Sequence, residues 1–398
     1  MNLTIAILGL AGLVFVHELG HFVVARLVGM SPRKFYIGFP PALVRVRRKG
    51  IEYGIGAIPL GGYVKIPGMH RPAPSDLDAH VARAVDERPV LANTVERVRA
   101  PLEAGDLEAA ARVLPELEAA IELASISDGA RRTAQRGLNE VRDGLARDAY
   151  WLQSTWKKVA VIFAGPGTNL LVALGLFTAL LMQDAWQIGV RLQASPDGAA
   201  TTRIEEVLPG TPAEDAGLMA GDRIAGVDGT PVGARGLLER IADSEGRPLE
   251  LSVQREDDTL VTRVAAERRS GLSPPAALER SAQITWHVTK QIALFFPRLA
   301  SGEGANEVSS PVGIAQVSSE ALAQGFDDFL FVLGLISLSL ALLNLLPLLP
   351  LDGGHIVFSL IEGVRGRALG RGIYERVSMV GIAFVLMLFA IGLSNDIG

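Results

Sequence analysis

The sequence contains no cysteine, so neither disulfide bonds nor thiolate chemistry contributes to its fold or function. It also lacks a basic excess, because 38 Lys and Arg residues stand against 43 Asp and Glu residues and the net charge is -5. With no stripe of basic residues among aromatic ones, nucleic acid is not an expected partner. Apolar residues are plentiful instead: 49% of the 398 residues are hydrophobic, and the mean hydropathy is +0.30. This composition favours a membrane protein over a soluble one.

Four apolar windows are long enough, or nearly so, to cross a bilayer, which needs about 20 apolar residues of helix. They cover residues 3–25, 159–182, 329–351 and 377–393. The first window could be mistaken for a signal peptide, but no Lys or Arg precedes Arg26 and the apolar stretch is too long for one. We therefore expect four membrane-spanning helices in a lipid bilayer, with the first one retained.

Basic residues gather near the ends of these windows. Seven follow the first window, two precede the second and four lie between the third and fourth: Arg26, Arg33, Lys34, Arg45, Arg47, Arg48 and Lys49; Lys157 and Lys158; Arg365, Arg367, Arg371 and Arg376. With four spans these clusters share one side of the membrane, which the positive-inside rule makes the cytosol. We expect a multi-pass protein of the inner (cytoplasmic) membrane, with both termini and residues 186–326 on the extracytoplasmic side.

Two segments between the first two windows differ from each other in composition. Residues 35–68 carry Gly, aromatic and β-branched residues in short runs, which predicts a small β-structure. Residues 72–150 are rich in Ala, Glu, Arg and Leu at helical spacing, which predicts a soluble helical insertion such as a helical hairpin. His70 and His80 flank the start of this insertion, and we expect both to face water rather than bind metal.

Residues 203–268 combine strand, turn and short-helix patterns. The pattern V-x-x-G-x-P-A begins at Val207, Ala216-Gly217-Leu218 follows, and G-D-x-I-x-x-V-D-G begins at Gly221. This order resembles bacterial PDZ domains, which bind extended peptides by adding a strand at a sheet edge. The resemblance implies a peptide or substrate segment as a partner. A domain that only fills or sizes the opening to a site is the alternative.

The segment His17-Glu18-Leu19-Gly20-His21 matches the H-E-x-x-H pattern. On a helix with about 3.6 residues per turn, His17 and His21 project from one face, so both imidazoles can reach one Zn²⁺ ion. Glu18 lies beside them and can take a proton from water on the ion. Because this motif falls in a stretch that crosses lipid, where ionisable groups are costly, a functional role is favoured over a satisfied pair of buried histidines.

A catalytic zinc site usually has three protein ligands and one open position for water. No acidic residue occurs in the segment 22–51, so the third ligand must come from elsewhere in the chain. Asp352 is the acidic residue that ends a long uncharged run. Pro347 and Pro350 precede it and would break a helix and turn Asp352 toward the interior of the helix bundle. His355 is the rival third ligand.

Several further motifs accompany these residues: residues 58–65 (IPLGGYVK), 164–169 (AGPGTN), 310–314 (SPVGI) and 344–354 (NLLPLLPLDGG). With them the chain resembles the site-2 protease family of intramembrane metalloproteases, especially the bacterial regulator-of-sigma-E type. The resemblance implies that His17, His21 and Asp352 hold zinc and that Glu18 is the catalytic base. It also implies that Asn344 helps to bind the substrate and that residues 35–66 form a membrane-associated β-loop that clamps an unwound substrate.

The expected fold is a polytopic α-helical membrane protein with a membrane-associated β-loop, an inserted soluble helical segment and an α/β PDZ domain. Along the chain we expect the first span and β-loop in 1–70, the insertion in 71–150, the second span in 151–185, the PDZ domain in 186–272, an amphipathic and linker segment in 273–326, and the last two spans with the Asp-Gly-Gly motif in 327–398.

The expected function is zinc-dependent hydrolysis of peptide bonds in the transmembrane segments of membrane proteins. Anti-sigma factors and remnant signal peptides are the substrates that the resemblance suggests. The alternative is a non-catalytic, PDZ-bearing membrane scaffold with a structural metal. Glu18 discriminates the two, because a structural site has no use for a carboxylate next to its ligands.

Overall fold

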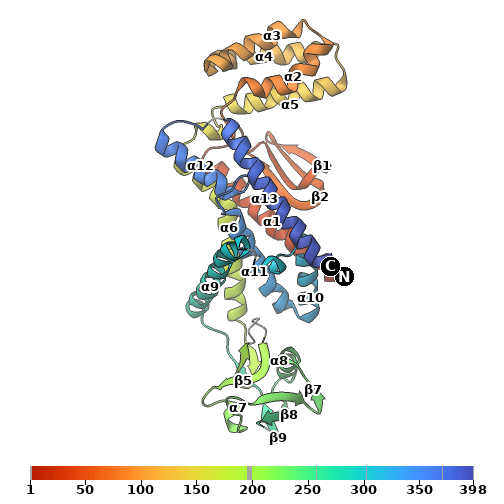
Figure 1. Cartoon of the computed structure of the whole chain (residues 1–398), viewed down its shortest axis with the longest axis vertical. Coiled ribbons are helices and arrows are strands. Elements are labelled where there is room, and N and C mark those ends of the chain that lie inside the picture. Colours follow the sequence, from red (N-terminus) through yellow and green to blue (C-terminus); the bar gives the residue numbers. More distant parts are fainter. Residues whose placement is uncertain (1, 195–199, 257, 302, 370, 398) are drawn as a thin grey trace. The chain divides into compact units, whose positions relative to one another are not determined.

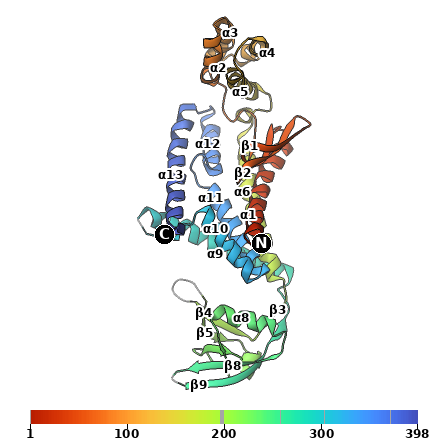
Figure 2. The ribbon, with the colours of Figure 1, turned by 90° about the vertical axis from the view of Figure 1, so that its right-hand side faces the viewer.

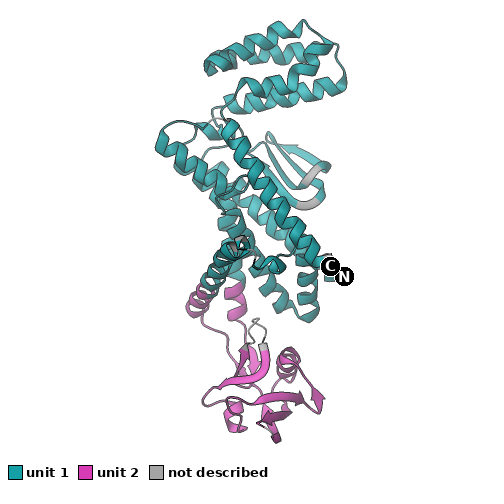
Figure 3. Ribbon diagram, in the orientation of Figure 1, with its two compact units in different colours: residues 1–176, 284–398 teal, residues 177–283 magenta. Residues whose placement is uncertain are grey.

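The computed structural model describes residues 2–194, 200–256, 258–301, 303–369 and 371–397 (Figure 1). The chain divides into two compact units, one comprising Met1–Leu176 with Ile284–Gly398 and the other Phe177–Gln283 (Figure 3). The first unit holds most of the apolar helices, a small sheet and the helical insertion. The second unit holds the residues with the PDZ-like pattern.

Four helices within the described residues are long and apolar enough to cross a membrane, as predicted (Figure 2). They are α1 (Asn2–Leu27), α6 (Thr155–Leu181), α11 (Phe326–Asn344) and α13 (Arg371–Ile397). The predicted end of the third span was wrong: α11 ends at Asn344 rather than at residue 351, because a turn containing Pro347 and Pro350 follows it. The helix α13 begins at Arg371, before the start of the predicted apolar window at residue 377.

The segment after α1 forms the β-structure that its composition predicts. Its strands β1 (Lys34–Arg48) and β2 (Ile51–Lys65) are an antiparallel pair. Lys49 and Gly50 connect them with φ angles of 50° and 80°, the left-handed conformation of a two-residue hairpin turn.

Both strands are long and bend back, so one part of β1 has neighbours on two sides. Phe35, for example, pairs with both Tyr53 and Val64. The end of β2, residues 62–65, pairs with residues 34–37 on one side. No strand among the described residues pairs with its other edge. We call residues 62–65 the cavity strand, because they line the cavity described below.

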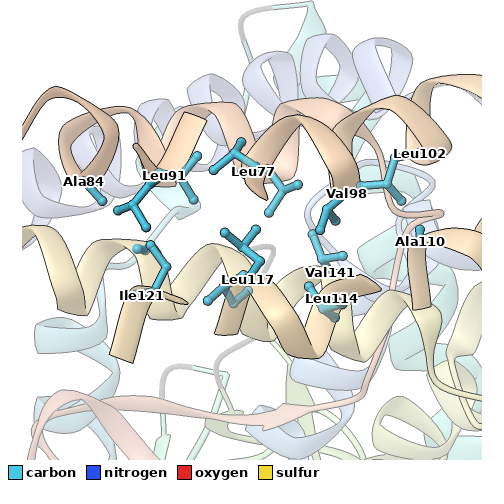
Figure 4. Close-up of a cluster of buried hydrophobic side chains, with 14 of the residues drawn as sticks. Leu77, Ala84, Leu91, Val98, Leu102, Ala110, Leu114, Leu117, Ile121 and Val141 are labelled. Carbon is cyan, nitrogen blue, oxygen red and sulfur yellow. The ribbon is translucent and has the colours of Figure 1, made fainter. Parts of the chain in front are cut away.

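The insertion, predicted as a helical segment such as a hairpin, has four helices rather than two. They are α2 (Pro74–Glu87), α3 (Leu91–Ala104), α4 (Leu107–Leu123) and α5 (Asp128–Leu145). Side chains from all four, including the fully buried Leu77 and Leu117, form one core (Figure 4). Asp106 and Ser127 cap α4 and α5, each accepting a hydrogen bond from a backbone N–H three residues on. Gly105 ends α3 in the left-handed conformation, a stop that the helical spacing alone did not reveal.

The second unit contains a sheet in the order β4-β5-β6-β8-β9, with β7 paired to β6. Its elements are β3 (Ala185–Gln187), β4 (Val190–Ala194), β5 (Ala200–Val207), α7 (Pro212–Asp215), β6 (Arg223–Val227), β7 (Thr230–Pro231), α8 (Ala234–Asp243), β8 (Pro248–Arg255), β9 (Asp258–Ala265) and β10 (Glu267–Arg269). Ile204 and Ile224 from the sheet and Leu237 from α8 belong to its buried core. The strand, short helix and strand that the PDZ-like pattern predicts are present as β5, α7 and β6.

An ion pair gives the Gly-Asp motif of this unit a structural role. Asp222 is almost fully buried, and its two carboxylate oxygens accept hydrogen bonds of 2.8 Å from Arg255. Oδ2 also accepts a hydrogen bond of 2.9 Å from Met219 N. The guanidinium of Arg255 holds the pKa of Asp222 below its ordinary value, so the carboxylate stays ionised in the folded unit.

The described residues contain further helical segments. A short one, η1 (Tyr150–Leu152), precedes α6, and the others lie near the last two spans: α9 (Pro274–Ala300), η2 (Ala305–Glu307), α10 (Pro311–Gln324) and α12 (Asp352–Arg365). Of these, α12 was not predicted as a helix. α10 packs against α1 and α11. Asp396, near the end of α13, fixes the N-terminus of α10 by accepting hydrogen bonds from Ser310 N at 2.7 Å and Gly313 N at 3.1 Å.

Candidate metal centre

Two histidines of α1 and one aspartate of α12 come together. His17 and His21 are buried and lie one helical turn apart on α1, while Asp352 is the first residue of α12. The Nε2 atoms of His17 and His21 are 3.2 Å apart. Oδ2 of Asp352 lies 3.3 Å from each of them. Among the described residues, these three form a group of donor atoms close enough to share one metal ion.

The geometry of the three donor atoms fits zinc. Two ligands of a tetrahedral zinc ion, at bond lengths of about 2.0 to 2.1 Å, lie roughly 3.3 to 3.4 Å apart. The observed separations of 3.2 and 3.3 Å therefore match three corners of a tetrahedron. Asp352 Oδ2 is buried and accepts no hydrogen bond from the described residues, so a cation would satisfy it. Two imidazoles and one carboxylate are also a donor set that catalytic zinc sites use.

Helix α6 holds the histidines in place. His21 Nδ1 donates a hydrogen bond of 2.8 Å to Val161 O, which leaves Nε2 directed at the other two donor atoms. Gly165, one turn further along α6, lies against the Nε2 atoms of both histidines, and a Cβ there would overlap them. The close approach of α6 to the metal centre therefore requires glycine at this position.

Glu18 lies in the same cavity as the three donor residues. This cavity has a volume of about 610 Å³ and is lined by residues from α1, β2, α11, α12 and the insertion. Gly62 of the cavity strand lies against Glu18: a Cβ added at Gly62 would be 3.0 Å from Cγ of Glu18. The carboxylate thus lies where α1 and the cavity strand meet, next to the donor group.

Asn344 also lines this cavity, at the C-terminal end of α11. Its Nδ2 donates a hydrogen bond of 3.0 Å to Leu340 O. Residues 345–351 then connect α11 to α12 and return the chain to the cavity at Asp352. The turn expected from the prolines before Asp352 is present, and it places the carboxylate against the two histidines.

The remaining histidines lie outside the donor group. His355, the rival ligand, lines the cavity, but its ring packs near Tyr374 with a centroid separation of 6.4 Å. His70, predicted to face water, also lines the cavity, and its ring lies 4.7 Å from that of Tyr374. That contact joins residues far apart in the sequence, so the local pattern could not reveal it. His80 Nδ1 lies 3.0 Å from Asp76 O within α2, away from the donor group.

Sequence reasoning missed two sets of residues in this site. The first set is Val161 and Gly165, which fix the histidines. Gly165 does lie in the motif 164–169 that contributes to the family resemblance, but the sequence pattern indicated no role for it in the site. Pro72, Asp76 and Glu140 bring the insertion to the cavity wall. No local signal marks these last three, because their approach depends on how the insertion packs against the rest of the first unit.

An H-E-x-x-H helix among apolar helices, with an oxygen donor from a distant turn, defines a membrane-embedded metallopeptidase. Comparison with known proteins gives the same class, since the profile of peptidase family M50 matches residues 5–388. The chain belongs to this family, the site-2 proteases.

Similar proteins cover nearly the whole chain. A candidate zinc metalloprotease of Brucella suis biovar 1 is 27% identical over 417 residues, which cover 96% of this chain and 92% of the relative. The candidate protease Eep of Enterococcus faecalis is 27% identical over 414 residues, covering 97% and 96%. Among solved structures, the HtrA3 PDZ domain aligns at 30% identity with 22% of this chain and 91% of its own length, with a TM-score of 0.19.

Proposed function

We propose that this metalloprotease is a zinc-dependent intramembrane endopeptidase that hydrolyses peptide bonds in the transmembrane segments of other proteins. The observation that carries the proposal is the donor group itself. His17 and His21 lie within α1, a helix long and apolar enough to cross a membrane, and converge with Asp352 beside the carboxylate of Glu18. Ionisable groups at such depth are costly and are retained for function.

The proposed roles follow from the positions of the side chains. His17, His21 and Asp352 would hold zinc, which would supply the positive charge that polarises the substrate carbonyl and lowers the pKa of water. Glu18 takes the proton from the attacking water and returns it to the nitrogen of the departing peptide. Asn344, on the cavity wall, holds the backbone of the substrate near the site.

The cavity strand provides a place for an unwound substrate. A helical substrate resists hydrolysis because its carbonyls are hydrogen-bonded and crowded, so it must become extended first. The open edge of residues 62–65 can pair with such an extended segment as an added strand. Leu43, Val44 and Val46 on the same hairpin are exposed, which suits a β-loop in contact with membrane. The test of the proposal is to locate the bond that is cut in a membrane-spanning substrate.

The basic clusters at the ends of the spans support an orientation in the inner membrane. The positive-inside rule places them in the cytosol and the second unit, between α6 and α11 in the sequence, on the extracytoplasmic side. In that position a PDZ domain would meet the outer parts of substrates, such as anti-sigma factors or remnant signal peptides. A non-catalytic scaffold is the weaker candidate, because it leaves Glu18 without a role.

Deletion of residues 203–268 tests the part played by this PDZ-like unit. If the unit binds or excludes the outer part of substrates, the deleted protein should cleave substrates whose large outer domains have not been trimmed. Wild-type protein should cleave only the trimmed forms. The readout is the fraction of each form cut, and unchanged selectivity would leave the unit with only a structural or docking role.

A further inference from the structure

The helical insertion forms part of the catalytic cavity. Pro72 precedes α2, Asp76 lies in its first turn and Glu140 lies on α5, and all three line the same cavity as His17 and Glu18. The insertion is therefore a neighbour of the site, and what it contributes there can be read from its contacts with the hairpin.

One carboxylate of the insertion connects both ends of the hairpin. Asp143 of α5 is buried, with 8% of its surface exposed. Its Oδ1 accepts a hydrogen bond of 3.0 Å from Arg33 Nε, and its Oδ2 lies 3.1 Å from Lys65 Nζ. Arg33 immediately precedes β1 and Lys65 ends the cavity strand, and Arg33 N donates a hydrogen bond of 2.7 Å to Lys65 O. Asp143 thus holds together the two chain segments that begin and end the hairpin.

Neighbouring groups reinforce this connection. Asp148 pairs with Arg33 through two hydrogen bonds of 3.1 Å, and Glu140 pairs with Lys65 at 2.8 Å. Burial lowers the pKa of Lys65, but Glu140 and Asp143 raise it more, so the pKa ends above its ordinary value and the side chain stays charged. The backbone joins as well, since Tyr150 N donates a hydrogen bond of 2.8 Å to Pro67 O.

We propose that the insertion positions the cavity strand for substrate binding and that Asp143 is the positioning residue. The inference rests on the proposed function, in which the open edge of residues 62–65 pairs with the substrate. Lys65 is the last residue of that edge, so its bond to Asp143 fixes the strand beside Glu18. Without Asp143, two basic groups lose a buried partner and the strand end gains freedom that substrate binding must remove again.

Asp143→Asn tests this role in the full-length protein with a membrane-spanning substrate. We expect KM to rise about tenfold, a moderate figure because Arg33 and Lys65 are partly solvated. Because Asp143 touches neither the metal ligands nor Glu18, zinc content should be unchanged and kcat should stay within about twofold, as expected of an interaction that acts through binding. Asp143→Glu, which keeps the charge, should restore part of the lost affinity.

Glu118→Gln is the matched control. This substitution removes the ion pair between Glu118 of α4 and Arg142 of α5, in which Arg142 Nε donates a hydrogen bond of 2.8 Å to Glu118. Arg142 directly precedes Asp143 in the sequence, but this ion pair does not involve the hairpin. This variant should keep the wild-type KM. Amide hydrogen exchange of residues 62–65 should become faster in Asp143→Asn and remain unchanged in Glu118→Gln.

Wild-type KM and wild-type exchange in Asp143→Asn would overturn the proposal. An equal rise in KM in Asp143→Asn and Glu118→Gln would overturn the proposal too, and so would a fall in the zinc content of Asp143→Asn. Either result would show a general structural effect. Failure of the proposed function would look different: the wild-type protein would cut no membrane-spanning substrate, whereas the exchange measurement would still report whether Asp143 holds the strand.

Discussion

Glu18→Gln is expected to reduce cleavage by about 10² to 10⁴, the usual contribution of a general acid–base group. Glutamine keeps the size of glutamate and much of its hydrogen bonding, but it cannot accept the proton from the attacking water. His17, His21 and Asp352 are unchanged, so zinc content should persist. Turnover of a membrane-spanning substrate by purified protein, measured beside metal analysis of the same sample, checks both statements.

Substrate binding should also survive this substitution, because neither Asn344 nor the cavity strand is altered. A complex between the Gln variant and its substrate should therefore become recoverable. Glu320→Gln, which changes an exposed glutamate on α10, is the control and should cleave normally. Near-normal cleavage by Glu18→Gln would show that another group takes the proton, and the role given to Glu18 would have to be abandoned.

His21→Ala is expected to remove zinc from the protein. Wild type should contain about one zinc per chain, held by three ligands. The loss of zinc affinity should exceed the roughly 10- to 100-fold drop that follows when only a residue that hydrogen-bonds to a metal ligand is removed. His21→Ala deletes a ligand and also the hydrogen bond to Val161 O. Metal analysis of purified protein, with increasing chelator, measures the effect.

The same measurement separates the two candidates for the third ligand. Asp352→Asn should weaken zinc binding, since Asp352 Oδ2 lies 3.3 Å from both Nε2 atoms, while His355→Ala should retain the metal. Equal zinc in wild type and His21→Ala would contradict the metal centre as a whole. Loss of metal in His355→Ala together with its retention in Asp352→Asn would show that the third ligand has been assigned to the wrong residue.

The features of the fold and the site that depend on the spacing of nearby residues could be predicted from the sequence. His17 and His21 share a helix face because they are four residues apart. The apolar windows revealed the four described helices that are long and apolar enough to cross a membrane, because lipid demands length and composition rather than particular contacts. The helix that begins at Asp352 was missed. Its short amphipathic pattern follows directly on a long apolar run, which obscured where α11 ends and where α12 begins.

The contacts made by distant parts of the chain could not be predicted. Asp143 lies in a helix whose charged residues read as an ordinary solvated surface, and only the folded chain brings it to Arg33 and Lys65. Val161 is an apolar residue whose backbone oxygen, rather than its side chain, orients His21. Side-chain patterns carry no information about such backbone acceptors.

The position of the cut bond tests the central claim most directly. A suitable substrate is a membrane peptide that accumulates in cells producing Glu18→Gln and disappears when wild type is restored. Wild-type protein and this substrate should be purified, placed together in bilayers, and the ends of the products sequenced by mass spectrometry. We expect a cut inside the apolar, membrane-spanning segment that depends on zinc and on Glu18. Cuts confined to the water-exposed flanks, or cuts that persist without zinc, would contradict it.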